Sequence, residues 1–503
     1  MQLTGAGPLF SASDIISYAS CLHLVGLERA VAEGRLEPPD ERDPAAQLAA
    51  DRGHHRRPAG RAGCHLPGGL PGPALALERP RFAKMAAGSS LQSGTIAVED
   101  AIRLCRALDR STLVIQGPPG SGKTYTGARL IVDLLDQGKR VGVAALSHKA
   151  IHNLLAEVER VLQTVPAAKS FRGLKKCSTD HPESEFDSKT SWIRNSSQVA
   201  DFADGRLALV AGTAWLFPRP ELDGALDYLF IDAAGQIALA DALAMGTAAR
   251  NLVLLGDPQQ LPQAAQGVHP GRSGVSVLEH LLDGRATVPP DRGLFLDQTR
   301  RMHPDICAFV SEISYERRLR AVAGCERQRI DSAGISGAGI RFIPVPHQGN
   351  SQASIEEATV IRAEIDRLVG GAWTDKAGAV RPLRCEDILV VAPYNLQVQT
   401  LREALPAGVR VGTVDKFQGQ DAPVVFFSMT TSSGAEIPRN LEFLLSRNRL
   451  NVALSRAQCL AVVVASLGLL DIDCRTIEQM RLVNAICRLS EVQGRDPGRS
   501  PAG

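Results

Sequence analysis

Ten short apolar runs, separated by segments with helical spacing, are the feature that most limits how this chain can fold. The runs before residue 298 are TLVIQ, VGVAAL, LALVAG, YLFID and LVLLGD, and those after it are RFIPV, ILVVAPY, VRVGTV, VVFFSM and LAVVVAS. A strand that is apolar at every position is typical of a parallel sheet covered by helices on both faces. Each set of runs suits one domain. We therefore predict an α/β fold with two tandem, doubly wound parallel-sheet domains.

The composition is ordinary for a globular chain of 503 residues, with 44% hydrophobic and 22% charged residues. A net charge of +2 neither requires nor excludes a nucleic-acid partner. The ten cysteines include no CxxC pair, so we expect reduced thiols and no structural zinc or iron–sulfur cluster. No run approaches the roughly 18 apolar residues of a membrane span, and the amino terminus lacks a signal peptide. We expect a cytoplasmic protein without a membrane partner.

Changes in composition along the chain set the expected domain boundaries. Residues 11–50 have helical spacing, whereas residues 54–84 are dense in Gly, Pro and Arg and have no period. We predict the following division: an amino-terminal segment 1–56, an irregular linker 57–93, a first domain 94–297 with a small insertion at about 165–206, a second domain 298–490, and a flexible tail 491–503.

The stretch GPPGSGKT matches the phosphate-loop pattern GxxxxGK[ST], and it lies between a predicted strand and a predicted helix, as that motif requires. Glycines let backbone amides curl around phosphate oxygens, and the start of the helix adds a positive dipole end. Lys123 can reach the β- and γ-phosphates, and the Thr124 hydroxyl can bind magnesium. The predicted nucleotide-binding residues are Gly117, Pro118, Pro119, Gly120, Ser121, Gly122, Lys123 and Thr124.

A second part of this site is predicted in YLFIDAAGQ, where an apolar strand ends in Asp232. Asp232, about 110 residues after the phosphate loop, fits as the second magnesium anchor beside Thr124. By itself, an Asp after an apolar strand most often marks only a strand end. Together with the phosphate loop it predicts a site for ATP and Mg²⁺.

Four further motifs follow in order: GDPQQLPQ (256–263), LDQTRRMHP (296–304), VGTVDKFQGQ (411–420) and RLNVALSRAQ (449–458). With the phosphate loop they resemble superfamily 1 helicases, in the branch of the nonsense-mediated-decay RNA helicase and the eukaryotic nuclease–helicase of Okazaki-fragment processing. The resemblance covers about residues 94–490 and implies two RecA-like domains of the P-loop NTPase class that move 5′→3′ along a single strand. It makes Gln260 a γ-phosphate sensor, and Arg301 and Arg456 the arginines that face the γ-phosphate, catalytic roles shared with Lys123 and Asp232.

The resemblance also implies contacts with a nucleic-acid backbone at Ser147, His148, Lys149, Thr213 and Thr413. Hydroxyls, amides and a lysine grip phosphates without reading base sequence. For each residue alone, helix capping or core packing is an equally good interpretation. Trp215 could stack on a base, although a core tryptophan is the better expectation. Single-stranded DNA is favoured over RNA because of the ancestry described next.

The first 56 residues are similar to the start of the RecB-like nuclease domains that are fused to such helicases in bacteria. The metal-binding histidine of those nucleases would correspond to His54 or His55. Those enzymes also need a later Asp and a Glu-x-Lys motif, which the linker does not supply. We expect a nuclease remnant without activity.

One departure from the helicase pattern bears on chemistry, because Ala233 stands where the family has a glutamate. That glutamate would be the general base for the attacking water, a role that contributes about 10²- to 10⁴-fold. No acidic residue lies within three positions after Ala233. Two hypotheses remain: a helicase or translocase with reduced ATP turnover, or a clamp on single strands that ATP switches without hydrolysis.

Overall fold

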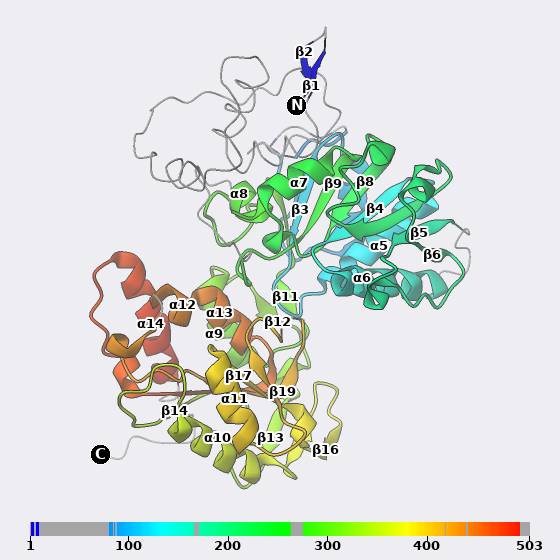
Figure 1. The fold of residues 1–503 in the computed structure, drawn as a ribbon. Helices are drawn as coiled ribbons and strands as arrows, with labels where there is room; N and C mark the ends of the chain where they lie inside the picture. The colour runs from blue at the N-terminus through cyan, green and yellow to red at the C-terminus, as the bar shows by residue number, and fades with distance from the viewer. Residues whose placement is uncertain are drawn as a thin grey trace.

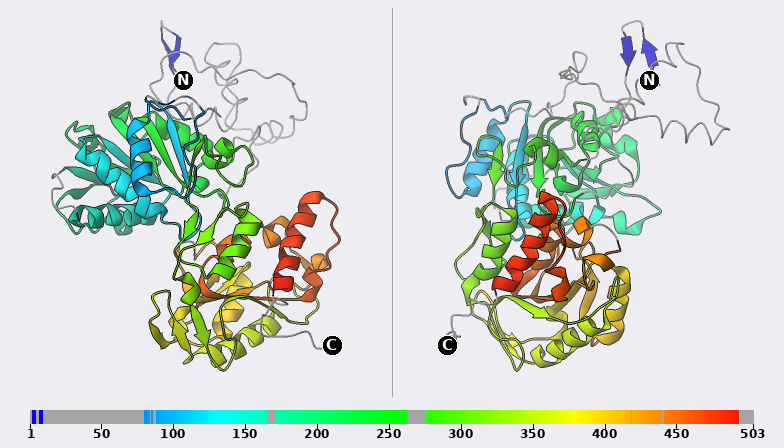
Figure 2. Two further views of the ribbon diagram at one scale, coloured as in Figure 1. Left: turned by 180° about the vertical axis from the view of Figure 1, so that it is seen from behind. Right: turned by 90° about the vertical axis from the view of Figure 1, so that its left-hand side faces the viewer.

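The computed structural model describes residues 2–4, 7–9, 80–83, 85, 88–164, 171–262, 275–417, 419–438 and 441–492. These residues form two lobes, each built around one parallel sheet (Figure 1), and the views in Figure 2 show the lobes one above the other. The predicted helix at 11–50, His54, His55, most of the linker and all but the start of the tail lie outside the described residues.

The first lobe contains an eight-stranded sheet in the order β10-β3-β9-β8-β4-β7-β5-β6, and all neighbouring strands in it are parallel. Its strands are β3 (Thr112–Gln116), β4 (Val141–Ala145), β5 (Gly173–Lys176), β6 (Ile193–Ser196), β7 (Leu209–Thr213), β8 (Leu226–Ile231), β9 (Ala249–Gly256) and β10 (Gly293–Phe295). Its helices are α4 (Val98–Ala107), α5 (Lys123–Asp136), α6 (His148–Thr164), α7 (Leu239–Gly246) and α8 (Val277–Leu282).

The second lobe contains a five-stranded parallel sheet in the order β14-β20-β19-β17-β18. Its strands are β14 (Gly339–Pro344), β17 (Ile388–Ala392), β18 (Arg410–Thr413), β19 (Ala422–Ser428) and β20 (Ala457–Ala465). Its helices are α9 (Pro304–Ser314), α10 (Ile355–Leu368), α11 (Asn395–Ala404), α12 (Leu441–Leu445), α13 (Arg447–Leu454) and α14 (Ile477–Val492). Smaller sheets pair β1 (Gln2–Thr4) with β2 (Gly7–Leu9), β11 (Gln298–Thr299) with β12 (Arg320–Ala321), and β15 (Ala372–Thr374) with β13 (Arg329–Asp331) and β16 (Val380–Pro382).

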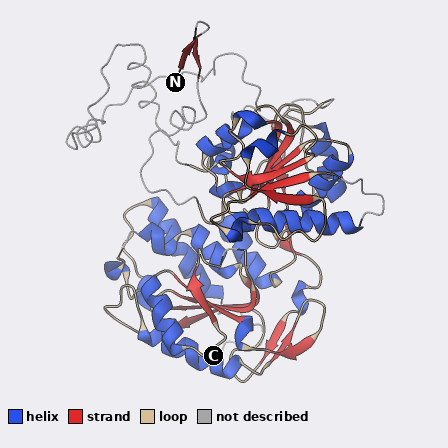
Figure 3. Ribbon diagram, turned by 45° about the vertical axis from the view of Figure 1, so that its right-hand side comes forward, coloured by secondary structure: helices blue, strands red, loops and turns tan. Residues whose placement is uncertain are grey.

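Both faces of each large sheet are covered by helices (Figure 3), which explains why the strands are apolar throughout. In β3, Leu113 and Ile115 join one hydrophobic cluster with α4, α5 and α6, whereas Val114 joins the cluster of α7 and α8. In the second lobe, Val390 and Leu389 divide in the same way. Alternating residues therefore serve opposite faces, each buried Val, Leu or Ile contributing roughly 1.5–3 kcal/mol. The predicted fold class is confirmed.

Two segments, at residues 91–92 and within 165–206, pack as parts of the first lobe, although they were predicted to be linker and insertion. Leu91 and Gln92 fall in the predicted linker, but Leu91 is buried in the first core, and the Gln92 side chain bonds to both backbone polar groups of Phe295. The packed part of the first lobe thus begins before residue 94. The predicted insertion at 165–206 supplies β5 and β6, so much of it extends the sheet.

No helix in the described ranges is long and apolar enough to cross a membrane.

Candidate nucleotide and nucleic-acid sites

The phosphate loop connects β3 to α5 through two glycines in the left-handed region, Gly120 at φ 73° and Gly122 at φ 89°. A side chain at Gly120 would also collide with Thr299, because a Cβ there would lie 2.6 Å from the Thr299 Oγ1. The Ser121 hydroxyl is buried and has no hydrogen-bond partner in the part of the chain that the structure describes. A tight loop at a helix start with an unpaired buried hydroxyl fits a bound phosphate chain.

The charges predicted for this site act on one another. Burial lowers the pKa of Lys123, the carboxylates of Asp257 and Asp232 oppose that shift, and the guanidinium groups of Arg301 and Arg456 add to it. The Lys123 Nζ donates a hydrogen bond to the Gly117 carbonyl of its own loop. The structure therefore brings the lysine, the strand-end aspartate and both arginines into one electrostatic environment.

Asp232 directly follows β8, and its Oδ1 accepts a hydrogen bond of 2.9 Å from the Ala233 amide. Burial raises the pKa of the Asp232 carboxyl, while that amide and the Lys123 charge lower it. Thr124 lies in the first turn of α5. Thr124 and Asp232 thus provide the hydroxyl and carboxylate oxygens that a magnesium ion prefers. Ala233 has φ 54°, a left-handed conformation unusual for a residue with a Cβ.

Gln260 belongs to a hydrogen-bond network that joins the two lobes. Its Nε2 donates to the Asp257 Oδ2 at 2.9 Å, and the Tyr315 hydroxyl of the second lobe donates to the same oxygen at 2.6 Å. The Asn451 amide donates to the Tyr315 hydroxyl at 2.7 Å and to the Gln259 carbonyl at 2.8 Å. Burial, followed by the Asp257 charge, raises the pKa of Tyr315 well above its ordinary value. We call these five residues the lobe-contact network.

The two predicted arginines lie where the second lobe meets the phosphate loop, Arg456 buried and Arg301 half-buried. The Arg301 Nε lies 2.7 Å from the Asp421 Oδ2, and its Nη1 donates to the Ser455 carbonyl at 3.1 Å. Two residues before Arg301, the Thr299 hydroxyl donates to the Pro119 carbonyl of the loop at 2.9 Å. The Arg456 Nε donates to the Val452 carbonyl at 3.0 Å.

Desolvation decides the pKa of both guanidinium groups. Burial lowers the pKa of Arg301, and the Asp421 carboxylate opposes that shift. Burial and then the Arg301 charge lower the pKa of Arg456 to about 9. In this structure both arginines donate to groups of their own lobe. They lie beside the loop as a pair of cations that a new anion could attract.

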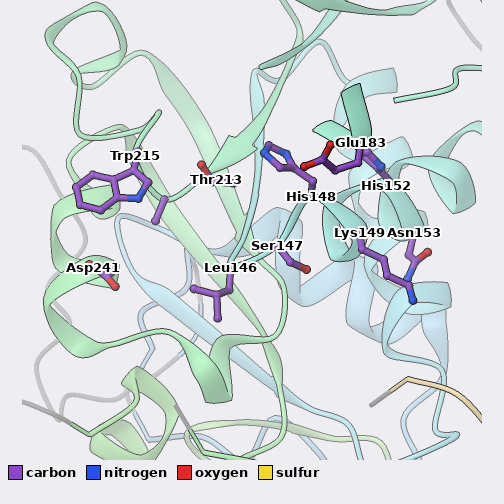
Figure 4. Close-up of a pocket in the computed structure, with 11 residues that line it drawn as sticks. Leu146, Ser147, His148, Lys149, His152, Asn153, Glu183, Thr213, Trp215 and Asp241 are labelled. Atoms are coloured by element: carbon purple, nitrogen blue, oxygen red, sulfur yellow. The ribbon is translucent and has the colours of Figure 1, made fainter. Parts of the chain in front are cut away.

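Most of the predicted nucleic-acid residues line one pocket of about 880 Å³, the α6 pocket (Figure 4). Its lining residues are Leu146, Ser147, His148, Lys149, His152, Asn153, Glu183, Thr213, Ala214, Trp215 and Asp241. Ser147, His148 and Lys149 stand where β4 gives way to α6, and Thr213 ends β7, the neighbouring strand. Thr413 is not brought to this pocket, because it ends β18 in the second lobe.

The expectation that Trp215 belongs to the core is wrong. Its side chain is 75% exposed and lines the α6 pocket from the turn that follows β7. Leu216 and Phe217, which follow it, are the buried residues of this turn and pack into the core. An exposed tryptophan beside polar groups is suited to stacking on a base.

Sequence reasoning missed the residues that connect the predicted ones. Asp257, Tyr315, Asn451 and Asp421 hold Gln260 and Arg301 in place. Asp257 and Asn451 lie inside two of the helicase motifs and Asp421 directly follows a third, but none of them was assigned a role. Tyr315 lies outside every motif, and neither Tyr315 nor Asn451 carries a signal of its contact with the other. They lie 136 residues apart along the chain, and they reach the first lobe only where the two lobes meet.

The chain is similar to known proteins over most of its length. Two family models, both described as an AAA domain, match residues 99–273 and 274–467. The DNA replication ATP-dependent helicase/nuclease DNA2 of Gallus gallus is 25% identical over 367 residues, which cover 71% of this chain and 35% of that protein. The DNA-binding protein SMUBP-2 of Rattus norvegicus is 25% identical over 417 residues, covering 69% and 40%.

Among solved structures, a complex of Arterivirus nonstructural protein 10 (helicase) with DNA is 15% identical, covers 77% of this chain and 66% of that one, and has a TM-score of 0.39. The chain spans roughly a third of the length of the curated relatives that it matches first.

Proposed function

This chain belongs to the superfamily 1 P-loop helicases, and from that premise we propose that it is an ATP-dependent helicase or translocase acting on single-stranded nucleic acid. One observation carries the proposal: the phosphate loop, Asp232, Arg301 and Arg456 share one electrostatic environment at the contact between two parallel-sheet lobes. Such an arrangement lets a bound nucleotide change how the lobes meet.

Each residue of the site has a definite part in this proposal. The loop amides from Gly117 to Thr124 hold the phosphates, and Lys123 neutralises their charge. Thr124 and Asp232 would hold Mg²⁺, which would supply neutralisation of the phosphate charge. Gln260 senses the γ-phosphate, and the lobe-contact network passes that signal to Tyr315 and α13.

The two arginines are proposed to exchange partners when ATP binds. Arg301 would leave Asp421, and Arg456 the carbonyls around it, for the γ-phosphate, where guanidinium groups stabilise the charge of phosphoryl transfer. Residues 94–297 and 298–490 are the proposed moving units. Their alternation moves a single strand, which we propose runs 5′→3′ because of the resemblance to that helicase branch.

Turnover is proposed to be slow because Ala233 provides no general base. Asp257 is a candidate to replace it, because its backbone packs against this turn: a Cβ at Gly235, two residues after Ala233, would lie 2.7 Å from the Asp257 carbonyl oxygen. The Asp257 carboxylate, however, already accepts from Gln116, Gln260, the Gln259 amide and the Tyr315 hydroxyl. A carboxylate whose oxygens are occupied by four donors is poorly placed to accept a proton from an attacking water.

The α6 pocket is the proposed place where the first lobe grips the strand, with Thr413 as a contact from the second lobe. Lys149 and the hydroxyls of Ser147 and Thr213 would bind phosphates, and Trp215 would stack on a base. We favour DNA over RNA as the substrate on the names of relatives, a DNA replication helicase/nuclease and a DNA-binding protein.

Ala233 specifically favours a second candidate function, a clamp whose grip on a single strand depends on ATP binding and not on hydrolysis.

The test of both functions is ATP turnover with and without single-stranded DNA, run beside unwinding of duplexes that carry a 5′ or a 3′ tail. We expect slow turnover that DNA accelerates and unwinding from the 5′ tail. ATP-dependent DNA binding with no turnover would support the clamp, and no ATP binding at all would overturn both functions.

A further inference from the structure

Lys175 is a buried lysine next to the α6 pocket that the proposed function does not use. It lies on β5 and has no exposed surface. Its Nζ lies 3.0 Å from the His148 Nδ1 and donates to the Ser184 carbonyl. No salt bridge to Lys175 occurs among the described residues. Burying an ammonium without a carboxylate is unfavourable, so stability does not explain this lysine.

The chemistry of an ammonium decides the protonation of the ring beside it. Burial lowers the pKa of Lys175 to about 8, which still leaves it mostly charged at neutral pH. An ammonium has three donors and no acceptor, so the His148 Nδ1 must accept from it. Burial, and then the charges of Lys175 and His152, lower the pKa of His148, so its ring stays neutral. A neutral imidazole that accepts at Nδ1 carries its proton on Nε2.

The position of the His148 ring decides which group its Nε2 proton can reach. The His148 Nδ1 faces buried Lys175. The same ring lines the α6 pocket (Figure 4), so Nε2 is the ring nitrogen left to meet a ligand there. We infer that Lys175 is a positioning residue, which holds His148 as a neutral Nε2–H donor for a phosphate of the bound strand. This inference rests on the proposed binding of nucleic acid in that pocket.

The charges that surround His148 are mixed in sign. His152 lies one turn further along α6 with its ring centroid 6.2 Å away, Lys175 and Lys176 come from β5, and Glu183 follows β5. Cys177 and Glu185 act on Lys175 in turn. Lys149 and Asp241 complete the titratable groups of the pocket. Only Lys175 makes a hydrogen bond with His148 among the described residues.

The first test reads the tautomer directly in the full chain labelled with ¹⁵N-histidine, with the His148 signals identified by their loss in His148→Ala. We expect an Nε2–H ring at pH 7 in the wild type. An Nδ1–H ring, or a ring protonated on both nitrogens, would overturn the inference. This readout needs no nucleic acid, so it separates failure of the Lys175–His148 pair from failure of the pocket as a binding site.

The second test measures binding of a fluorescent oligothymidylate between pH 5.5 and pH 8 by Lys175→Met, His148→Ala, the double variant and the control Lys176→Met. We expect Lys175→Met to weaken binding about three- to tenfold at pH 8, the loss of one hydrogen bond. Toward pH 5.5 its affinity should recover, because a ring freed from Lys175 becomes protonated and attracts phosphate.

The double variant should not recover, and Lys176→Met should resemble the wild type. An equal loss at every pH, with a further full loss in the double variant, would mean that Lys175 is merely structural. A wild type that binds no oligothymidylate would instead overturn the proposed role of the α6 pocket.

Discussion

The phosphate-loop region and the α6 pocket occupy neighbouring halves of one sheet edge, yet they are built in opposite ways. The loop and Asp232 follow β3 and β8, while Ser147 and Thr213 mark the ends of β4 and β7, the next two strands in the sheet. Around the loop, the charged groups are buried or half-buried and act on one another. In the pocket, Ser147, Lys149 and Trp215 are exposed or nearly so. The edge of a parallel sheet thus provides two sites with different electrostatics.

If the proposed function holds, this difference lets one substitution change ATP turnover without changing the affinity for a single strand. In the buried region each charge depends on its neighbours, so the loss of a single group changes the reaction. In the pocket the contacts are separate and screened by water, so each contributes a modest amount. Ala233 lies in the first region and does not line the α6 pocket. Four substitutions would test whether the two regions act separately, and their expected effects range from large to small.

Lys123→Ala should weaken ATP binding by about 2–5 kcal/mol, because it removes a buried cation that faces the phosphates. Its affinity for single-stranded DNA without nucleotide should stay within twofold of the wild type. Calorimetric titration with ATP and anisotropy with an oligonucleotide measure the two affinities. Lys139→Ala, just beyond the end of α5, is the matched control. A parallel loss of DNA affinity would break the separation of the two regions.

Tyr315→Phe should destabilise the protein by about 1–3 kcal/mol, since it removes the O–H that Asp257 accepts in the lobe contact. It should also reduce the stabilisation that ATP gives in thermal unfolding. Tyr228→Phe is the control, because the Tyr228 hydroxyl donates to the Cys105 carbonyl within the first lobe. An equal response to ATP in the two variants would show that the lobe-contact network does not sense nucleotide.

Trp215→Ala should weaken binding of single-stranded DNA by about 1–3 kcal/mol through the loss of one stacked base. Trp215→Phe should restore most of that affinity, and ATP binding without DNA should be unchanged in both. Anisotropy titrations at one fixed salt concentration are the measurement. An unchanged DNA affinity in Trp215→Ala would remove the pocket from the binding path.

Lys149→Ala should have the smallest effect. It removes one phosphate contact, so the slope of log affinity against log salt should fall by about 0.7 for a single strand. At high salt the variant and the wild type should converge. A constant difference at every salt concentration would show that Lys149 acts through structure and not through charge.

Much of the fold could be predicted because parallel strands bear a local signature. A strand buried on both faces is mostly apolar, and the ten runs show that pattern. The phosphate loop could be predicted too, since its glycines are required by backbone geometry within eight residues. The exposure of Trp215 could not be predicted, because the sequence does not show that Leu216 and Phe217, and not Trp215, fill the core at this turn. The partner of His148 was hidden for a related reason: Lys175 reaches it only when β5 joins the sheet.

The central claim is that this chain keeps its ATP site but lacks the general base. The measurement that tests it compares ATP affinity and steady-state turnover, with saturating single-stranded DNA, for the wild type, Ala233→Glu and Ala233→Gln. All three residues have a Cβ, so the left-handed turn at this position costs each of them about the same. We predict equal ATP affinities, with turnover raised about 10²- to 10⁴-fold by Glu and unchanged by Gln. Rapid turnover in the wild type that Ala233→Glu does not increase would contradict the claim.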